Sequence, residues 1–161
     1  MSYAECRDGV KTILQGLTGT FTNTWQVTAG DYQVLDKGLP PGKPYAAVLT
    51  AGSFESDEAI SCQSTKHWDV MIDLFVRYTN SAETNTRFDS TRDAVIGQLD
   101  KYPSLNHVDG VSSVVVSATG DPVQINHKAV SGSVDTGPTF MVQTLRVSVT
   151  QRVALTGGEY T

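Results

Sequence analysis

The sequence predicts an α+β fold, in which two α-helices pack on one face of a mixed, mostly antiparallel β-sheet that carries long loop or hairpin excursions. In residues 68–78 every second side chain is apolar, as in a strand with one buried face, because side chains alternate across a strand. Residues 2–17 and 83–102 instead repeat apolar side chains at spacings of three and four, which is typical of helices. Val-rich segments between and after them supply further strands.

Residues 66–79 (KHWDVMIDLFVRYT) are predicted to form the central strand, because this stretch exceeds the usual strand length of roughly 5–6 residues. Its buried face consists of Trp68, Val70, Ile72, Leu74, Val76 and Tyr78. The intervening positions are mixed: Asp69, Met71, Asp73, Phe75 and Arg77. This second face is amphipathic and leaves room for a helix or for another subunit.

The first helix is predicted over residues 2–17, with Ser2 as N-cap, Glu5 completing a capping box, and glycines at 16 and 19 ending it. Its apolar stripe is Tyr3, Cys6, Val10, Ile13, Leu14 and Leu17. The second helix follows the N-cap candidates Asn80 and Ser81 and stops at Pro103. Its apolar face is Phe88, Thr91 or Arg92, Val95, Leu99 and Tyr102. Both helices are expected on the same face of the sheet.

The remaining segments before the central strand alternate between strand and loop patterns. Trp25 and Val27 indicate a strand, and residues 36–44 form an extended or turning connection because proline restricts the chain. Residues 45–52 predict a short strand, and residues 53–65 a protruding loop or β-hairpin arm.

After the second helix, residues 111–118 predict a strand and residues 139–154 a last strand that closes the sheet. Between them lies a long excursion, residues 120–138, in which Val123 and Ile125 are expected to pair briefly. Residues 1–161 form one domain, within the common range of ~50–200 residues, and residues 155–161 are expected to be flexible.

The charge and cysteine content narrow the function classes. A formal net charge of −5 argues against a basic nucleic-acid-binding face; it indicates simple solubility or a surface that repels nucleic acid. Cys6 and Cys62 fit no metal or redox motif, and free thiols are favoured over a disulfide between them. Without an apolar signal core or a run of ~20 apolar residues, we expect a protein that is cytoplasmic or assembled there, and no membrane contact.

Acidic residues occur in two places. Glu55, Asp57 and Glu58 lack the D-x-D-x-D-G spacing of a divalent-metal loop, so a solvated acidic loop is expected. Asp69 and Asp73 lie four residues apart on one strand face, about 13 Å at ~3.3 Å per residue. This exceeds the ~5–9.5 Å separation of glycosidase carboxyls, so we expect them to face solvent or a subunit contact.

No other residues form a recognised catalytic or metal-binding pattern. His67, His107 and His127 are scattered through separate segments, and GxSxG, P-loop and GxGxxG motifs are missing. The proximity of Cys62 to His67 is attributed to chance. The sequence therefore predicts no enzyme, no catalytic, cofactor-binding or metal-binding residues, and no cofactor.

The order of these elements resembles the tail terminator (tail completion) proteins of long-tailed bacteriophages, also called minor tail protein U in the lambda group. The resemblance extends over most of the chain. It rests on a W-x-h-x-h-x-h strand (h apolar) at residues 68–74, polar N-caps at Asn80 and Ser81, and D-x-h-h-x-x-L at residues 93–99, followed by a late strand. These motifs are patterns rather than fixed residues.

The resemblance implies a ring of six copies at the head-proximal end of the tail tube, which ends tube polymerisation and presents the docking surface of the neck. Its partners would be the tail tube protein and head-completion or neck proteins, and DNA would pass through the lumen without specific binding. The protein would belong to the tail or neck of the virion, after assembly in the host cytoplasm. A closed ring requires heterologous contacts whose rotation divides the circle.

Candidate lumen or interface residues follow from this picture. The acidic Glu55, Asp57 and Glu58 would line the lumen, and the second face of the central strand would supply a contact between subunits. That face carries Asp69, Met71, Asp73 and Phe75. Met71 and Phe75 are equally compatible with packing under a loop within one subunit.

Two other functions stay open. The first is another neck component, a head-closure or head-to-tail joining protein, which shares the size and the ring arrangement. The second is a small ligand-binding or hydrolytic α+β domain, which needs an enclosed pocket with convergent polar groups.

Overall fold

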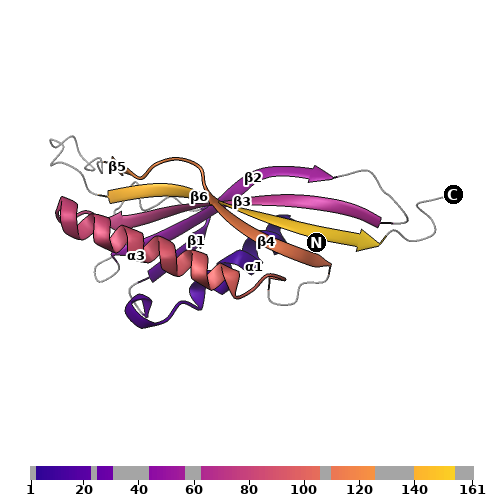
Figure 1. Ribbon diagram of the computed structural model, residues 1–161, viewed down its shortest axis with the longest axis horizontal. Coiled ribbons are helices and arrows are strands. Elements are labelled where there is room, and N and C mark those ends of the chain that lie inside the picture. The colour runs from indigo at the N-terminus through magenta and orange to yellow at the C-terminus, as the bar shows by residue number, and fades with distance from the viewer. Residues whose placement is uncertain are drawn as a thin grey trace.

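The computed structural model describes residues 3–22, 25–30, 44–56, 63–105, 110–125 and 140–154. Within them the chain forms a mixed, mostly antiparallel six-stranded sheet, with helices α1 and α3 on one face (Figure 1). The predicted α+β fold class is confirmed. None of the described helices combines the length and the apolarity needed to cross a membrane.

Strand β3 (Gln63–Arg77) occupies the centre of the sheet, as predicted. It pairs antiparallel with β2 (Tyr45–Ser56) on one side and with β6 (Phe140–Ala154) on the other. β1 (Trp25–Ala29) adds to β2 in parallel, and β4 (Val111–Ala118) adds to β6 antiparallel. The short β5 (Val123–Ile125) pairs with the first residues of β6, which confirms the brief pairing expected there.

Both helices bury the stripe that their spacing predicts. Helix α1 (Tyr3–Gln15) buries Cys6, Val10, Ile13 and Leu14, and a 3₁₀ turn (Gly19–Phe21) follows it. Helix α3 (Ser81–Asp100) buries Thr84, Phe88, Thr91, Val95 and Leu99. Two side chains tie the end of α1 to its neighbours. The Gln98 amide donates to the carbonyl of Ile13 (3.1 Å), and the Trp25 indole donates to that of Leu14 (3.0 Å).

The main core lies between the helices and the sheet. From β3 it receives Trp68, Val70, Ile72, Leu74 and Val76, five of the six residues that the alternating pattern predicts. The sixth, Tyr78, follows the end of β3 and is only half-buried. A second, smaller apolar cluster lies on the opposite face of the sheet. It consists of Ala46, Val48, Phe75 and Phe140, with Val142 packed against it. The sheet is therefore apolar on both faces around the first half of β2.

Two strand boundaries and one strand position differ from the prediction. β2 continues to Ser56 instead of ending near residue 52, and β3 begins at Gln63. Residues 53–56 are thus part of a hairpin arm, one of the two forms expected for residues 53–65. β6 lies inside the sheet between β3 and β4, so β4 forms the edge on this side. The predicted cap Ser2, the connection 36–43, residues 57–62 and 126–139, and the tail 155–161 lie outside the described residues.

Helix α3 begins with a reciprocal cap. The Asn80 side-chain oxygen accepts from the Glu83 main-chain N–H (2.9 Å), and the Asn80 amide donates to the Glu83 carboxylate (3.1 Å). The Thr79 hydroxyl also donates to this carboxylate (3.0 Å). A helix start leaves its first N–H groups without main-chain partners, so this cap satisfies one of them and places a negative charge near the positive end of the helix.

Replacing Asn80 with alanine is expected to lower the free energy of unfolding by about 1 kcal/mol, because the first turn loses its side-chain acceptor. Asn85→Ala is the matched control, since Asn85 is exposed within the same helix and alanine has the higher helix propensity. Urea unfolding of both variants measures the difference. Equal midpoints for the two variants would show that the cap contributes nothing.

Candidate interaction surface

The face of the sheet opposite α1 and α3, here called the second face, displays polar side chains from β3 and β6. They alternate with the core residues, so they share one side of the sheet. The register places them in pairs: Asp69 with Ser148, Met71 with Arg146, and Asp73 with Thr144. Five of these side chains are half-buried and Arg146 is exposed, so this part of the second face is accessible in the single chain.

Both aspartates of the second face accept hydrogen bonds from neighbouring hydroxyls. Thr144 donates to Asp73 Oδ1 at 2.5 Å. Asp69 accepts from Ser148 at Oδ1 (2.9 Å) and from Ser53 at Oδ2 (2.7 Å). Each carboxylate thus has its own hydroxyl partners from an adjacent strand, and Met71 lies between the two on β3. The arrangement holds two carboxylates in place on the second face.

A bulge in β2 makes the Ser53–Asp69 hydrogen bond possible. The register between β2 and β3 shifts between Ala51 and Phe54, so Gly52 and Ser53 both lie opposite Asp69. A Cβ on Gly52 would stand 2.8 Å from Asp69 Cβ and 2.9 Å from its carbonyl oxygen, so only glycine fits. Beyond the bulge, Phe54 contacts Trp68, with ring centroids 4.4 Å apart.

Phe75 is placed differently from the other candidates on β3. Only 2% of its surface is exposed, and its ring meets Phe140 edge to face with centroids 6.0 Å apart. It therefore packs within the subunit. Met71 remains half-buried beside Arg146 and is the apolar side chain of β3 that the second face still offers to another molecule.

The acidic segment after the bulge is described only in part. Glu55 is exposed and pairs with His67, so it lies on the second face with the aspartates. The His67 ring nitrogen Nδ1 and the Thr150 hydroxyl are 3.4 Å apart. Asp57 and Glu58, as well as His107 and His127, lie outside the described residues.

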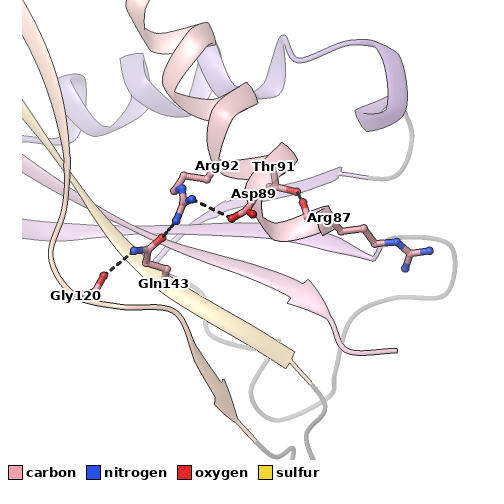
Figure 2. Close-up of polar contacts among 6 residues, drawn as sticks. All are labelled: Arg87, Asp89, Thr91, Arg92, Gly120 and Gln143. Atoms are coloured by element: carbon pink, nitrogen blue, oxygen red, sulfur yellow. Dashed lines mark hydrogen bonds and ion pairs between the residues drawn. The ribbon is translucent and has the colours of Figure 1, made fainter. Parts of the chain in front are cut away.

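A polar network on the helix-covered face holds the main chain just after the C-terminal end of β4. Figure 2 shows Gln143 of β6 between Arg92 of α3 and the main chain at Gly120. Arg92 donates to Gln143 Oε1 (3.2 Å) and contacts Asp89 (3.0 Å), while the Gln143 amide donates to the Gly120 carbonyl (2.6 Å). The buried amide of Gln143 thereby obtains its partners, and α3, β6 and the turn after β4 are held together.

Neither this network nor the bulge in β2 was predicted from the sequence. Gln143 is a polar residue at an inward position of β6, which is the one signal in the sequence that a buried hydrogen bond was needed. In the same view the Arg87 side chain points away from the network, and its main-chain carbonyl accepts from the Thr91 hydroxyl (2.7 Å).

Cys6 is a free, fully buried thiol on α1. Burial, with a smaller contribution from the negative charge of Asp69, raises the pKa of the Cys6 thiol from its ordinary value of 9.0 to about 12. The thiolate is the nucleophile, so this cysteine is unreactive in the folded chain at neutral pH.

The raised pKa predicts that alkaline pH destabilises the fold through Cys6. Between about pH 9 and 12 the unfolded thiol has lost its proton while the folded thiol keeps it. The free energy of unfolding therefore falls as pH rises through this window, and the stabilisation is intact below it. Denaturation across pH 7–11 should show a steeper alkaline decline for the native chain than for Cys6→Ala. Parallel declines would contradict this assignment.

Two further observations concern metal ions and hollows within the described residues. No three His, Cys, Asp or Glu side chains in these ranges are grouped so that they could hold a metal ion. A hollow of about 560 Å³ lies beside the end of α1, lined by residues such as Leu17, Phe21 and Trp25, and its lining has no charged side chain.

Comparison of the chain with models of known protein families gives no match, and comparison with curated proteins gives none either.

Proposed function

We propose that this chain is a structural subunit of the tail terminator kind, six copies of which form a ring at the head-proximal end of a bacteriophage tail tube. The ring ends polymerisation of the tube and provides the docking surface for the neck, and DNA crosses its lumen. The observation that carries the proposal is the second face of the sheet, where Met71 and two fixed carboxylates lie accessible on the side opposite both helices.

The chemistry of the second face suits contact with protein. The second face offers hydrogen-bond partners from half-buried hydroxyl and carboxylate groups, together with two apolar side chains, the half-buried Met71 and the exposed Val115. Interfaces of this kind are rich in direct and water-mediated hydrogen bonds. The element order behind the resemblance supplies the class of assembly, and the tail tube protein and neck proteins are the partners that the class implies.

The acidic charge supports passage of DNA without binding. A protein holds DNA by neutralising phosphates with Lys and Arg, and this chain carries a formal net charge of −5. Glu55 is exposed at the end of the hairpin arm and is the described member of the acidic group Glu55, Asp57 and Glu58. Placed along a lumen, these side chains repel the DNA backbone and prevent it from sticking.

Changing Asp57 and Glu58 together to lysine, with Glu55 unchanged, should leave ring assembly intact and impair DNA passage, measured as infectivity of virions built with the variant. Two lysines on α3, at Asp93 and Asp100, are the matched control, since both of these acids are exposed on that helix. Unchanged infectivity of the first variant counts against the lumen assignment.

The proposed position in the virion is tested by mixing the purified protein with tail tubes that lack their cap and, separately, with DNA-filled heads. A terminator binds the open end of the tube and stops further growth when tube protein is added. Binding to heads with no effect on tubes would instead favour a head-closure or head-to-tail joining protein.

A further inference from the structure

Among the described residues, one part of the sheet has an unpaired strand edge on each side. We call it the distal sheet: residues 50–56 of β2, 66–71 of β3, 146–151 of β6 and 111–117 of β4. The register runs through all of these strands, so that Thr50, Met71, Arg146 and Ser117 share one row and Phe54, Trp68, Val149 and Val114 another. Figure 1 shows these strands extending beyond α3.

The first open edge is the outer side of β2 beyond Leu49. β1 pairs with β2 from Tyr45 to Leu49 and ends at Ala29, and the N–H of the next residue, Gly30, donates to the Leu49 carbonyl (2.8 Å). Within the described ranges, residues 50–56 pair with β3 alone, and the side chains of residues 51–56 are all exposed.

The second open edge is β4, which pairs with β6 alone among the described strands. Its sequence, VSSVVVSA, contains no charge and no proline, and Val115 is 58% exposed. Soluble proteins normally protect an edge strand with charges, prolines or bulges, because its free N–H and C=O groups pair with other strands. Here a register shift near Val111 is the one such device, at the very start of β4.

The two edges are complementary in direction. Each neighbouring pair in the order β2, β3, β6, β4 is antiparallel, so β2 and β4 run in opposite directions. A second copy, brought beside the first by rotation about an axis along the strands, places its β2 next to β4 in an antiparallel pair. The two edges also have similar length, because the same rows of paired residues end at β2 on one side and at β4 on the other.

In the pairing just described, the β2 edge of one copy meets the β4 edge of the next, and we call it head-to-tail pairing. The charges at the two edges distinguish it from a twofold pairing of β4 with β4. Glu55 lies exposed on the second face at the β2 edge, while Arg152 and Arg146 lie exposed on the same face of β6, one strand in from the β4 edge. Arg152 is opposite Gly110, which has no side chain to block its reach towards the edge. Head-to-tail pairing brings opposite charges together, whereas β4–β4 pairing brings arginines together.

We infer that the outer edge of β2 (residues 50–56) of one copy pairs antiparallel with β4 of the next copy, so that the distal sheet continues from subunit to subunit. The inference rests on the proposed ring and names the contact that builds it. The contact is heterologous, the kind that closes into a ring when the rotation divides the circle.

Val115→Lys tests the β4 edge, because a lysine in the middle of an edge strand opposes strand addition. Val123→Lys is the matched control: Val123 is 55% exposed on β5, outside the distal sheet. Native mass spectrometry over a concentration series should show Val115→Lys weakening assembly by about tenfold or more and Val123→Lys leaving it unchanged. Thermal unfolding of both monomers checks that each variant folds.

Glu55→Arg and Arg152→Glu test the direction of pairing. Each alone should weaken assembly, and the double variant should recover most of it, whereas Asp93→Arg on α3 should have no effect. If the native chain forms a ring that is indifferent to Val115→Lys, the edge inference is overturned and the ring proposal stands. A dimer that is sensitive to Val115→Lys but not to Glu55→Arg overturns head-to-tail pairing. A monomer at every concentration overturns both.

Discussion

Replacing Phe75 with alanine should lower the free energy of unfolding of the isolated chain by about 3–5 kcal/mol. Phe75 is 2% exposed, and its ring packs against Phe140 with Val48 and Ala46 close by. Truncation removes most of the buried ring and leaves a cavity that the rigid strands cannot fill. Urea unfolding at a concentration where the chain is monomeric measures the loss.

Phe54→Ala is the matched control for Phe75→Ala. Phe54 lies on the neighbouring strand and is 50% exposed, so the same truncation should cost about 1 kcal/mol or less. If Phe75 instead served as a contact between subunits, its loss would leave the monomer as stable as Phe54→Ala does and would weaken self-association. That result would contradict the packing described for the second face.

Replacing Gly110 with alanine is the second large expected effect, a loss of about 2–5 kcal/mol in the free energy of unfolding. Gly110 has φ 78°, a left-handed conformation that costs a residue with a side chain roughly 1–2 kcal/mol. Its Cβ would also collide with the carbonyl oxygen of Arg152, and relieving such overpacking costs about 1–3 kcal/mol. The Gly110 carbonyl accepts from the Arg152 N–H (2.8 Å), so the change also disturbs the start of β4.

Gly120→Ala is the control, because Gly120 lies at the other end of β4, has open space around its Cα and keeps an ordinary φ. Thermal unfolding should show a large decrease in melting temperature for Gly110→Ala and little change for Gly120→Ala. Equal effects would mean that the conformation at Gly110 is not required. The variant also bears on assembly, since a displaced β4 cannot present its edge.

Periodicity predicted most of the fold because each main element has one dominant buried face. Trp68, Ile72 and Val76 alternate on β3, and Val10, Ile13 and Leu14 repeat on α1, so single-sequence patterns were sufficient. The caps were local signals as well: Asn80 with Glu83 at the start of α3 and Pro103 after its end require no tertiary information.

The extension of β2 to Ser56 escaped prediction for a local reason. Gly52 and Ser53 form the bulge, which interrupts the alternation and turns a strand into what resembles a polar loop. The requirement for glycine arises from Asp69 on another strand, and sequence order does not reveal that approach.

For the candidate interaction surface, the sequence predicted which residues share a face but not how they are divided on it. Alternation placed Asp69, Met71, Asp73 and Phe75 on one face, and they do share it. The separation of this face into an apolar part around Phe75 and Phe140 and a polar part around the aspartates depends on which strands are neighbours. The open edges of β2 and β4 likewise depend on strand order, which no local pattern encodes.

The central proposal is that copies of this chain assemble into a closed ring around a lumen. Native mass spectrometry of the purified chain, with negative-stain imaging of the same sample, tests it most directly. We expect a closed annular species of six copies with a central opening, in equilibrium with the monomer at low concentration. A monomer that persists at every concentration and in the presence of open tail tubes, with no annular particle in the images, would contradict it.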